Sequence, residues 1–270
     1  MNLKDKYMSL VRYLETLDKV LIAFSGGVDS TFLLKAAKDA LGENALAVTF
    51  NSPYIPSWEI KEAKLFTSDF NIKHLIIDMP IINEIMDNPE NRCYLCKKAL
   101  FSCVIDTAEK KNIKFVLDGT NADDIRDYRP GMKALKELNV KSPLLELGFT
   151  KEDIRLLSKE LGLNTWNKPA YACLLSRVPY GEKIEIEKLK KIEKSEMYLM
   201  SIGFKAVRVR NHNDVARIEV PKDQRVNFFD ENLLDDIVKN LKSFGFKYVC
   251  LDIEGYRTGS LNETIKNKNR

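Results

Sequence analysis

Residues 20–30 read Val-Leu-Ile-Ala-Phe-Ser-Gly-Gly-Val-Asp-Ser. The apolar, β-branched first half predicts a buried strand, and the glycine pair that follows predicts a turn leading into a helix. Gly26 and Gly27 allow backbone angles and close approaches that a Cβ atom would forbid. The amides that open the helix, at Ser30 and Thr31, offer unpaired donors at the positive end of the helix dipole. We therefore expect this turn to hold a pyrophosphate.

The same turn lacks the longer glycine loop and the lysine of the Walker pattern, which serves transfer of a γ-phosphate. A loop of this kind is expected instead to release pyrophosphate from ATP and to leave an adenylated substrate. A more ordinary interpretation exists, because Gly-Gly turns follow many strands and Ser30 could simply cap its helix. The complete Ser-Gly-Gly-x-Asp-Ser hexapeptide after a buried strand favours the nucleotide-binding interpretation.

The composition predicts two domains. The chain has 270 residues, of which 44% are hydrophobic and 30% charged, which is more than most single domains need. We place the boundary in a proline-punctuated stretch, which gives a nucleotide-binding domain at 1–175, a smaller domain at 176–262 and a flexible tail at 263–270. The net charge is only +4, from 43 basic and 39 acidic residues. This balance argues against duplex nucleic acid and suits a small anionic ligand.

Two further features bear on location. The N-terminus has no apolar signal segment, and no later run approaches the length that spans a bilayer. A cytoplasmic protein with no membrane partner is therefore expected. The chain has five cysteines, and an odd number in a reducing compartment favours thiols, a metal or an iron–sulfur cluster over a disulfide scaffold.

Strand-like segments alternate with helical patterns through the first half of the chain. This alternation predicts an α/β fold, with a parallel sheet covered by helices on both faces. Ligands of such sheets bind at the carboxyl ends of the strands. Polar residues gather at three of these ends, at 25–30, 51–54 and 118–121, and are expected to share one crevice. The expected strands are 20–24, 45–51, 73–78 and 114–118.

The second half predicts a small α+β domain. Before it, residues 150–153 form a helix-start box, and that helix is expected to run to about residue 163. The expected elements of the small domain are a helix at 185–202, strands at 205–210 and 215–220, a helix at 231–244 and a strand at 247–252.

The cysteines suggest a more specific chemistry. Cys93 and Cys96 stand at the expected opening of a helix, and Cys173 lies near the domain boundary. A lone Cys-x-x-Cys pair fits a redox pair or half of a zinc site. We favour a [4Fe-4S] cluster on the three thiolates, which would leave one iron open to a ligand such as hydrosulfide. Cys103 could substitute as a ligand but is expected to be buried and apolar, and Cys250 is expected in the core.

Six segments spread over nearly the whole chain carry a resemblance to one family: 25–30, 91–97, 118–124, 172–181, 208–210 with 216–219, and 255–260. Together they resemble the LarE family of ATP-dependent sulfur transferases, which belongs to the PP-loop ATP pyrophosphatase superfamily. The first segment alone is shared with GMP synthetases, NAD synthetases and tRNA-thiolating enzymes, whereas the later segments are specific.

The resemblance implies synthesis of the nickel-pincer nucleotide cofactor of lactate racemase. In that reaction, carboxylates of a pyridinium-3,5-dicarboxylate mononucleotide are adenylated and then converted to thiocarboxylates. In one type of family member, the cysteine at position 173 gives up its own sulfur and becomes dehydroalanine. In the other type, three cysteines hold a [4Fe-4S] cluster that carries sulfide. Because Cys93 and Cys96 accompany Cys173, the resemblance implies the cluster type, a sulfide donor and a homo-oligomer, with a hexamer as the candidate assembly.

Roles in the expected nucleotide site follow from residue chemistry. Asp29 could hold a magnesium ion (Mg2+) against the phosphates of ATP. Asn121 and Asp124 could complete the nucleotide or metal site, or could merely bond their own turn. The expected nucleotide-binding residues are Ser25, Gly26, Gly27, Asp29, Ser30, Gly119, Asn121 and Asp124, and the expected catalytic residues are Cys173, Asp29 and Arg177.

Arginines are the candidates for binding the substrate. Arg177 could contact the adenylate phosphate, and the alternative is an exposed arginine with no such role. Arg208 and Arg210 alternate along a strand and could hold a phosphate or carboxylate of the substrate. The family pattern adds Glu196 and Glu219 as acidic partners. Without the resemblance, these residues would be interpreted as a solvated strand face with surface ion pairs.

Two other functions remain as alternatives. A tRNA-thiolating enzyme would share the loop, the adenylation and the cluster, but it predicts a basic RNA-binding module or paired Cys-x-x-Cys units, which the sequence lacks. A non-catalytic nucleotide sensor would use the same loop without needing nearby thiols. Release of pyrophosphate that depends on a carboxylate substrate would separate an enzyme from a sensor.

Overall fold

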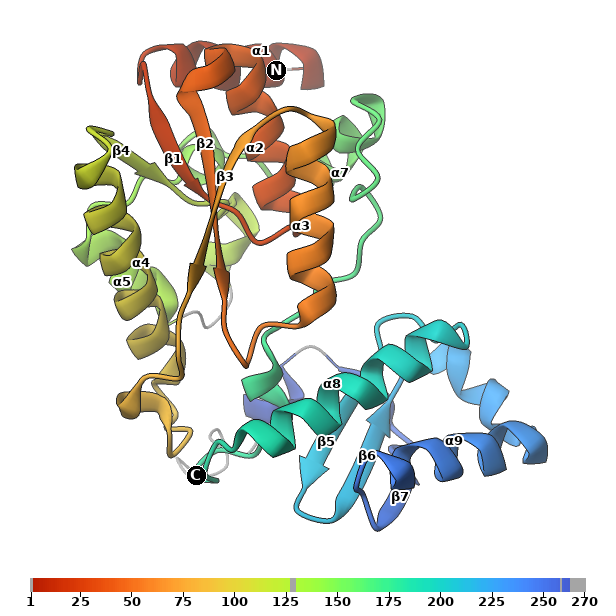
Figure 1. The fold of residues 1–270 in the computed structure, drawn as a ribbon. Coiled ribbons are helices and arrows are strands. Elements are labelled where there is room, and N and C mark those ends of the chain that lie inside the picture. The colour runs from red at the N-terminus through yellow and green to blue at the C-terminus, as the bar shows by residue number, and fades with distance from the viewer. Residues whose placement is uncertain (1, 127–129, 258, 263–270) are drawn as a thin grey trace. The chain divides into compact units, whose positions relative to one another are not determined.

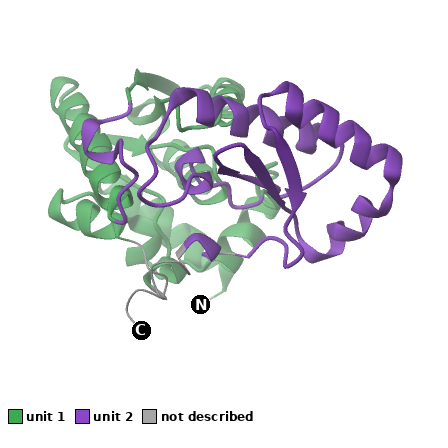
Figure 2. Ribbon diagram, turned by 90° about the horizontal axis from the view of Figure 1, so that it is seen from below, with its two compact units in different colours: residues 1–80, 91–168 green, residues 81–90, 169–270 purple. Residues whose placement is uncertain are grey.

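The structure is a computed structural model that describes residues 2–126, 130–257 and 259–262. The tail expected at 263–270 lies outside these residues. The chain divides into two compact units (Figure 2). Unit 1 contains residues 1–80 and 91–168, and unit 2 contains residues 81–90 and 169–270. The division falls at 168/169, where the sequence analysis places it at 175/176.

Unit 1 is built on a parallel sheet with strand order β3-β2-β1-β4 (Figure 1). The apolar run at the start of the loop motif forms β1, whose neighbours are β2 and β4. All four strands expected in the first half are confirmed, two of them with the expected bounds. The strands are β1 (Val20–Ala23), β2 (Ala45–Asn51), β3 (Lys73–Asp78) and β4 (Phe115–Leu117).

Both faces of this sheet are covered, as the apolar character of its strands predicts. In β1, Val20 and Ile22 pack into one core while Leu21 packs into the other, because successive side chains of a strand point to opposite faces. The first core is closed by α1 (Leu3–Glu15), α2 (Val28–Leu41), α3 (Ser57–Asp69), α6 (Pro143–Glu146) and α7 (Lys151–Glu160). The second is closed by α4 (Arg92–Lys110) and α5 (Gly131–Glu137).

The helix-start box before α7 is confirmed. The Thr150 side chain accepts a hydrogen bond from the backbone of Asp153, and the Asp153 carboxylate accepts one from the backbone of Thr150. The helix ends at Glu160, three residues earlier than expected, because Gly162 adopts a left-handed φ of 69° and the amide of Leu163 bonds back to the Ser158 carbonyl.

Unit 2 contains a three-stranded sheet in the order β5-β6-β7, with β5 antiparallel and β7 parallel to β6. Two helices pack on it through a core that includes Leu199, Val209 and Ile237. The α+β organisation is therefore confirmed. The elements are α8 (Ile186–Ser201), β5 (Arg208–His212), β6 (Val215–Glu219), α9 (Glu231–Ser243) and β7 (Tyr248–Leu251).

Two details of unit 2 differ from the sequence-based expectation. Strand β5 begins at Arg208 rather than at Lys205, because Ala206 has a left-handed φ of 52° that interrupts extended backbone. Cys250 is exposed, so its expected place in the core is wrong. The reason is that β7 pairs with β6 alone in this sheet and alternates exposed with half-buried residues.

The short segment 81–90 is grouped with unit 2 because its backbone carbonyls accept hydrogen bonds from residues 181 and 184. The amide of Ile184 donates to the Met86 carbonyl at 2.7 Å, and the amide of Gly181 donates to the Asn88 carbonyl at 3.1 Å. The side chain of Asn88 is fully buried and donates to the carbonyl of Val178 at 2.9 Å. No helix among the described residues is both long and apolar enough to cross a membrane.

Candidate active site

Residues 25–30, which are expected to hold pyrophosphate and are called the pyrophosphate loop below, join β1 to α2 in unit 1. Two serines of this loop stabilise it by hydrogen bonds. The hydroxyls of Ser25 and Ser30 lie 3.0 Å apart, and Ser30 Oγ donates to the Gly27 carbonyl at 3.2 Å. Gly26 has a φ of 71°, which side-chain-bearing residues rarely adopt. Gly27 is the N-cap of α2 and has no side chain that could satisfy the first-turn amides. The amide of Thr31 donates to the Gly27 carbonyl at 3.0 Å, so its expected availability is wrong, and the amides before it remain suited to an anion.

A second segment, after β4, lies against this loop. A Cβ atom at Gly119 would come within 2.9 Å of the backbone nitrogen of Ser30 and 3.2 Å of the Asp29 carbonyl carbon. Only glycine allows this close approach of two backbones. The structure thus brings together two of the polar segments that the parallel strand order predicts to converge.

Asp29 is the acidic residue of the loop, and its partners come from distant parts of the chain. Asn121, which is fully buried, donates from Nδ2 to Asp29 Oδ1 at 3.3 Å. The Asp124 carboxylate instead accepts the backbone amide of Asn121 at 3.0 Å, which is the turn chemistry considered as its alternative role. Asn121 therefore reaches the loop, and Asp124 acts through the shape of the turn that holds Asn121.

Two lysines that the sequence analysis missed contact the loop. Lys151 Nζ forms an ion pair with the carboxylate of Asp29. Lys168 Nζ donates to the Gly26 carbonyl at 2.9 Å and pairs with Glu62. The two lysines are 122 and 142 residues from their loop partners in sequence. No local sequence pattern could have indicated these contacts.

The Cys-x-x-Cys pair lies in the first turns of α4, also in unit 1. Cys93 is exposed and Cys96 is half-buried. Their spacing of three places them on one face of the helix. The hydroxyl of Tyr54, from the polar segment after β2, lies 3.4 Å from Cys96 Sγ. Cys173 belongs to unit 2, where it is half-buried and precedes the short 3-10 helix Leu174–Arg177.

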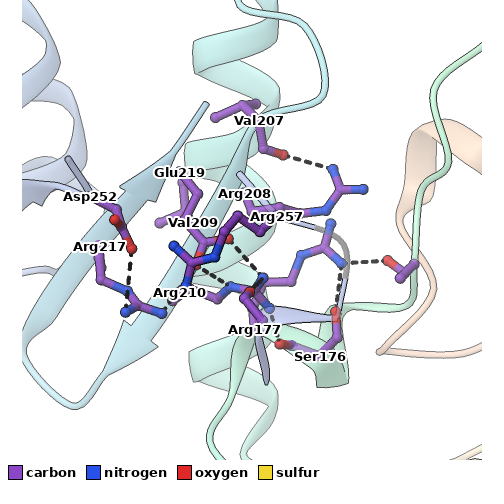
Figure 3. Close-up of polar contacts among 12 residues, drawn as sticks. Ser176, Arg177, Val207, Arg208, Val209, Arg210, Arg217, Glu219, Asp252 and Arg257 are labelled. Atoms are coloured by element: carbon purple, nitrogen blue, oxygen red, sulfur yellow. Dashed lines mark hydrogen bonds and ion pairs between the residues drawn. The ribbon is translucent and has the colours of Figure 1, made fainter. Parts of the chain in front are cut away.

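Unit 2 holds two buried arginine–glutamate pairs, and Figure 3 labels both members of one of them, Arg210 and Glu219. Arg177 is fully buried and forms two bonds of 2.9 Å to Glu196, and Glu196 also accepts the amide of Val209. Arg210 bonds Glu219 at 3.0 and 2.7 Å. The alternatives of an exposed Arg177 and of a solvated strand face are therefore wrong.

Arg208 is the first residue of β5, and its environment differs from that of Arg177 and Arg210. Its side chain is 2% exposed, and its guanidinium donates to the carbonyls of Val207 and Ala170. The rings of Tyr171 and Tyr256 lie 5.4 and 5.1 Å from the guanidinium carbon. Burial, and then the charge of Arg177, lowers the pKa of Arg208. Among the described residues, no carboxylate forms an ion pair with Arg208.

The comparisons with known proteins cover both units. The family profile of the queuosine biosynthesis protein QueC matches residues 19–92, which include the pyrophosphate loop. The pyridinium-3,5-bisthiocarboxylic acid mononucleotide synthase of Lactiplantibacillus plantarum is 40% identical to this chain, over 97% of this chain and 96% of its own length. The chain belongs to the LarE family. Uncharacterised proteins of Synechocystis sp. and Methanocaldococcus jannaschii are 43% and 37% identical over 97% and 95% of this chain, and cover 99% and 95% of their own lengths.

Membership in the LarE family makes the chain a PP-loop protein of the ATP-dependent sulfur transferase class. The pyrophosphate loop has the geometry that this class requires, with a glycine at the left-handed position and an uncapped helix start. A metal centre is a separate question. No three His, Cys, Asp or Glu side chains of the described residues are grouped as a ready metal site.

Proposed function

We propose that this LarE-family chain adenylates carboxylates of pyridinium-3,5-dicarboxylate mononucleotide with ATP, releases pyrophosphate, and converts the activated carboxylates to thiocarboxylates. The observation that carries the proposal is the relationship to the Lactiplantibacillus plantarum synthase. Because the match covers 97% of this chain, it includes the arginine-rich unit 2 as well as the widely shared loop.

The first half-reaction uses the pyrophosphate loop. A carboxylate oxygen of the substrate attacks the α-phosphorus of ATP, the bond from that phosphorus to the β-phosphate oxygen breaks, and pyrophosphate leaves with the electron pair. The free amides at the start of α2 and the closely packed Gly119 support a bound pyrophosphate. Carboxylate oxygens suit a hard cation, so Asp29 would hold Mg2+, which neutralises phosphate charge when bound, and the Asn121 amide would position that carboxylate.

Arg208 is the residue of unit 2 that we assign to the substrate anion. A buried guanidinium without a carboxylate partner is costly, and a phosphate or carboxylate of the substrate would supply the missing charge. Arg177 and Arg210 already have carboxylate partners in Glu196 and Glu219. We assign these two pairs the task of fixing the walls of the site.

The sulfur is proposed to come through Cys93, Cys96 and Cys173. Thiolates are the ligands that iron–sulfur clusters use, and Cys93 and Cys96, on one face of α4, would be two of the three residues that hold the cluster. When bound there, a [4Fe-4S] cluster would supply a site for hydrosulfide. The acyl carbon then accepts the sulfur, and AMP leaves with the oxygen that linked it to the substrate.

The proposal is tested by anaerobic turnover with ATP, the pyridinium dicarboxylate nucleotide and sulfide. We expect pyrophosphate release that requires the carboxylate substrate, and several sulfur atoms transferred per protein chain. Cys96→Ser should lose iron and multiple turnover, while Cys103→Ser, seven residues further along the same helix, serves as the matched control and should keep both.

The outcomes separate the parts of the proposal. Pyrophosphate release without the carboxylate substrate, or none at all, would overturn the reaction itself. A ceiling of one sulfur per chain, with Cys173 converted to dehydroalanine, would instead replace the cluster with the sacrificial-cysteine chemistry. The sulfide donor, the homo-oligomeric state and the cytoplasmic location are further expectations of the same proposal.

A further inference from the structure

We propose that Lys151 and Lys168 form the cationic side of the pyrophosphate site. This inference rests on the proposed use of ATP and adds two residues that neither the loop motif nor the family pattern assigned. It assigns them to the β- and γ-phosphates rather than to the adenosine or the α-phosphate.

The proposal starts from the lack of positively charged residues in the pyrophosphate loop. Pyrophosphate leaves with several negative charges, yet the loop 25–30 contains no basic residue and contributes the negative charge of Asp29. Phosphate-binding loops of the Walker type meet this need with a lysine inside the motif. In this chain, positive charge beyond that of a bound Mg2+ has to come from residues outside the loop, and the structure places two ammonium groups on the loop.

Lys151 lies where two helix starts meet. It is the first residue of α7, and its Nζ contacts Asp29, in the first turn of α2. Its own amide donates to the carboxylate of Asp123 at 2.7 Å, which anchors the start of α7 to the segment after β4. The Lys151 side chain is 37% exposed, so its ammonium is partly open to solvent. A phosphate beside the α2 amides would lie beside a second positive centre.

Lys168 approaches the loop at its other end. Its side chain is only 12% exposed, and its Nζ bonds the Gly26 carbonyl at 2.9 Å. The pairing carboxylate, Glu62, is 53% exposed and extends from α3. A phosphate oxygen that replaced the exposed Glu62 carboxylate would pair with Lys168 Nζ while the ammonium keeps its bond to the Gly26 carbonyl. Together the two lysines bracket the loop from residue 26 to residue 29.

This arrangement predicts a selective effect on nucleotide affinity. The test measures binding of α,β-methylene-ATP, inorganic pyrophosphate and AMP by calorimetry, at fixed magnesium and salt, to wild type, Lys151→Gln and Lys168→Gln. Loss of one charge-assisted contact should weaken the methylene analogue and pyrophosphate by roughly tenfold to hundredfold. Affinity for AMP, which lacks the β- and γ-phosphates, should stay within about twofold of wild type.

Controls distinguish phosphate binding from a structural role. Lys159→Gln removes another lysine of α7, which lies over Trp166, and should leave all three affinities unchanged. Lys151→Arg and Lys168→Arg keep the charge and should recover part of the lost affinity, whereas a purely structural lysine would weaken AMP and ATP analogue together. An unchanged ratio of the two affinities in both glutamine variants overturns this proposal. Failure of wild type to bind the ATP analogue overturns the proposed function instead.

Discussion

Among single residues, the buried arginines of unit 2 make contrasting contacts. Arg177 and Glu196 are 0% and 1% exposed and bond each other twice. Arg208 is 2% exposed and contacts carbonyls and tyrosine rings instead. The positive charge of Arg177 is therefore balanced by the carboxylate of Glu196. The positive charge of Arg208 is compensated only by carbonyl oxygens and aromatic rings.

The contrast gives a paired prediction for Arg177→Met and Arg208→Met. Loss of Arg177 leaves Glu196 buried and without its cation, and should lower the free energy of unfolding by about 3–5 kcal/mol. Loss of Arg208 leaves no carboxylate of the described residues without its ion-pair partner, and should change the free energy of unfolding by less than about 2 kcal/mol. Arg208→Met should nevertheless weaken binding of the pyridinium nucleotide strongly. Urea denaturation and calorimetry measure the two effects, and a large stability loss in both variants would contradict the distinction.

Between elements, His74 links three parts of unit 1. Located on β3, it lies 2.7 Å from Thr49 Oγ1 of β2 through Nε2 and 2.9 Å from Thr67 Oγ1 of α3 through Nδ1. Burial, with a smaller contribution from Lys64, lowers the pKa of His74 to about 4 from its ordinary value of 6.5. The histidine is therefore neutral in the folded protein at physiological pH, as its two threonine partners and its burial require.

This shift predicts how stability depends on pH. Between the folded pKa of about 4 and the unfolded value of 6.5, the unfolded chain binds a proton that the folded chain does not. Stability therefore falls as the pH drops through that window, by about 1 kcal/mol once partial solvent exposure is allowed for. His74→Gln should flatten this part of the profile, as measured by urea denaturation across the window. An equally steep profile in the variant would show that other groups cause the loss.

In the molecule as a whole, segment 81–90 of unit 2 is inserted in the chain between the two segments of unit 1. Asn88 is fully buried and donates to the carbonyls of Val178 and Pro179 at 2.9 and 2.7 Å. A fragment of residues 1–175 contains Asn88 but lacks both acceptors. The fragment also lacks Ile184 and Gly181, whose amides bond the backbone of segment 81–90, so it should unfold at lower temperature than the full chain. Calorimetric scans compare them, and an equally stable fragment would place the boundary where the sequence analysis had it.

The sequence predicted the parallel sheet because strand-like segments alternate with helical patterns through the first half of the chain, which is visible without any tertiary knowledge. It also predicted the pyrophosphate loop, in which Gly26 takes a left-handed φ of 71°. It could not predict the contacts of Lys151 and Lys168, because they join residues more than a hundred positions apart. Cys250 was misassigned for a similar reason, since an apolar strand pattern does not reveal that β7 pairs with β6 alone.

The central claim is that substrate carboxylates are activated as acyl adenylates, and an isotope experiment tests it most directly. The pyridinium dicarboxylate nucleotide is labelled with oxygen-18 in its carboxylates and turned over with ATP and sulfide, and the phosphate products are analysed by mass spectrometry. We predict one labelled oxygen in AMP for each sulfur installed, with unlabelled pyrophosphate. Label in orthophosphate, accompanied by ADP, would show activation by phosphorylation and would contradict the account.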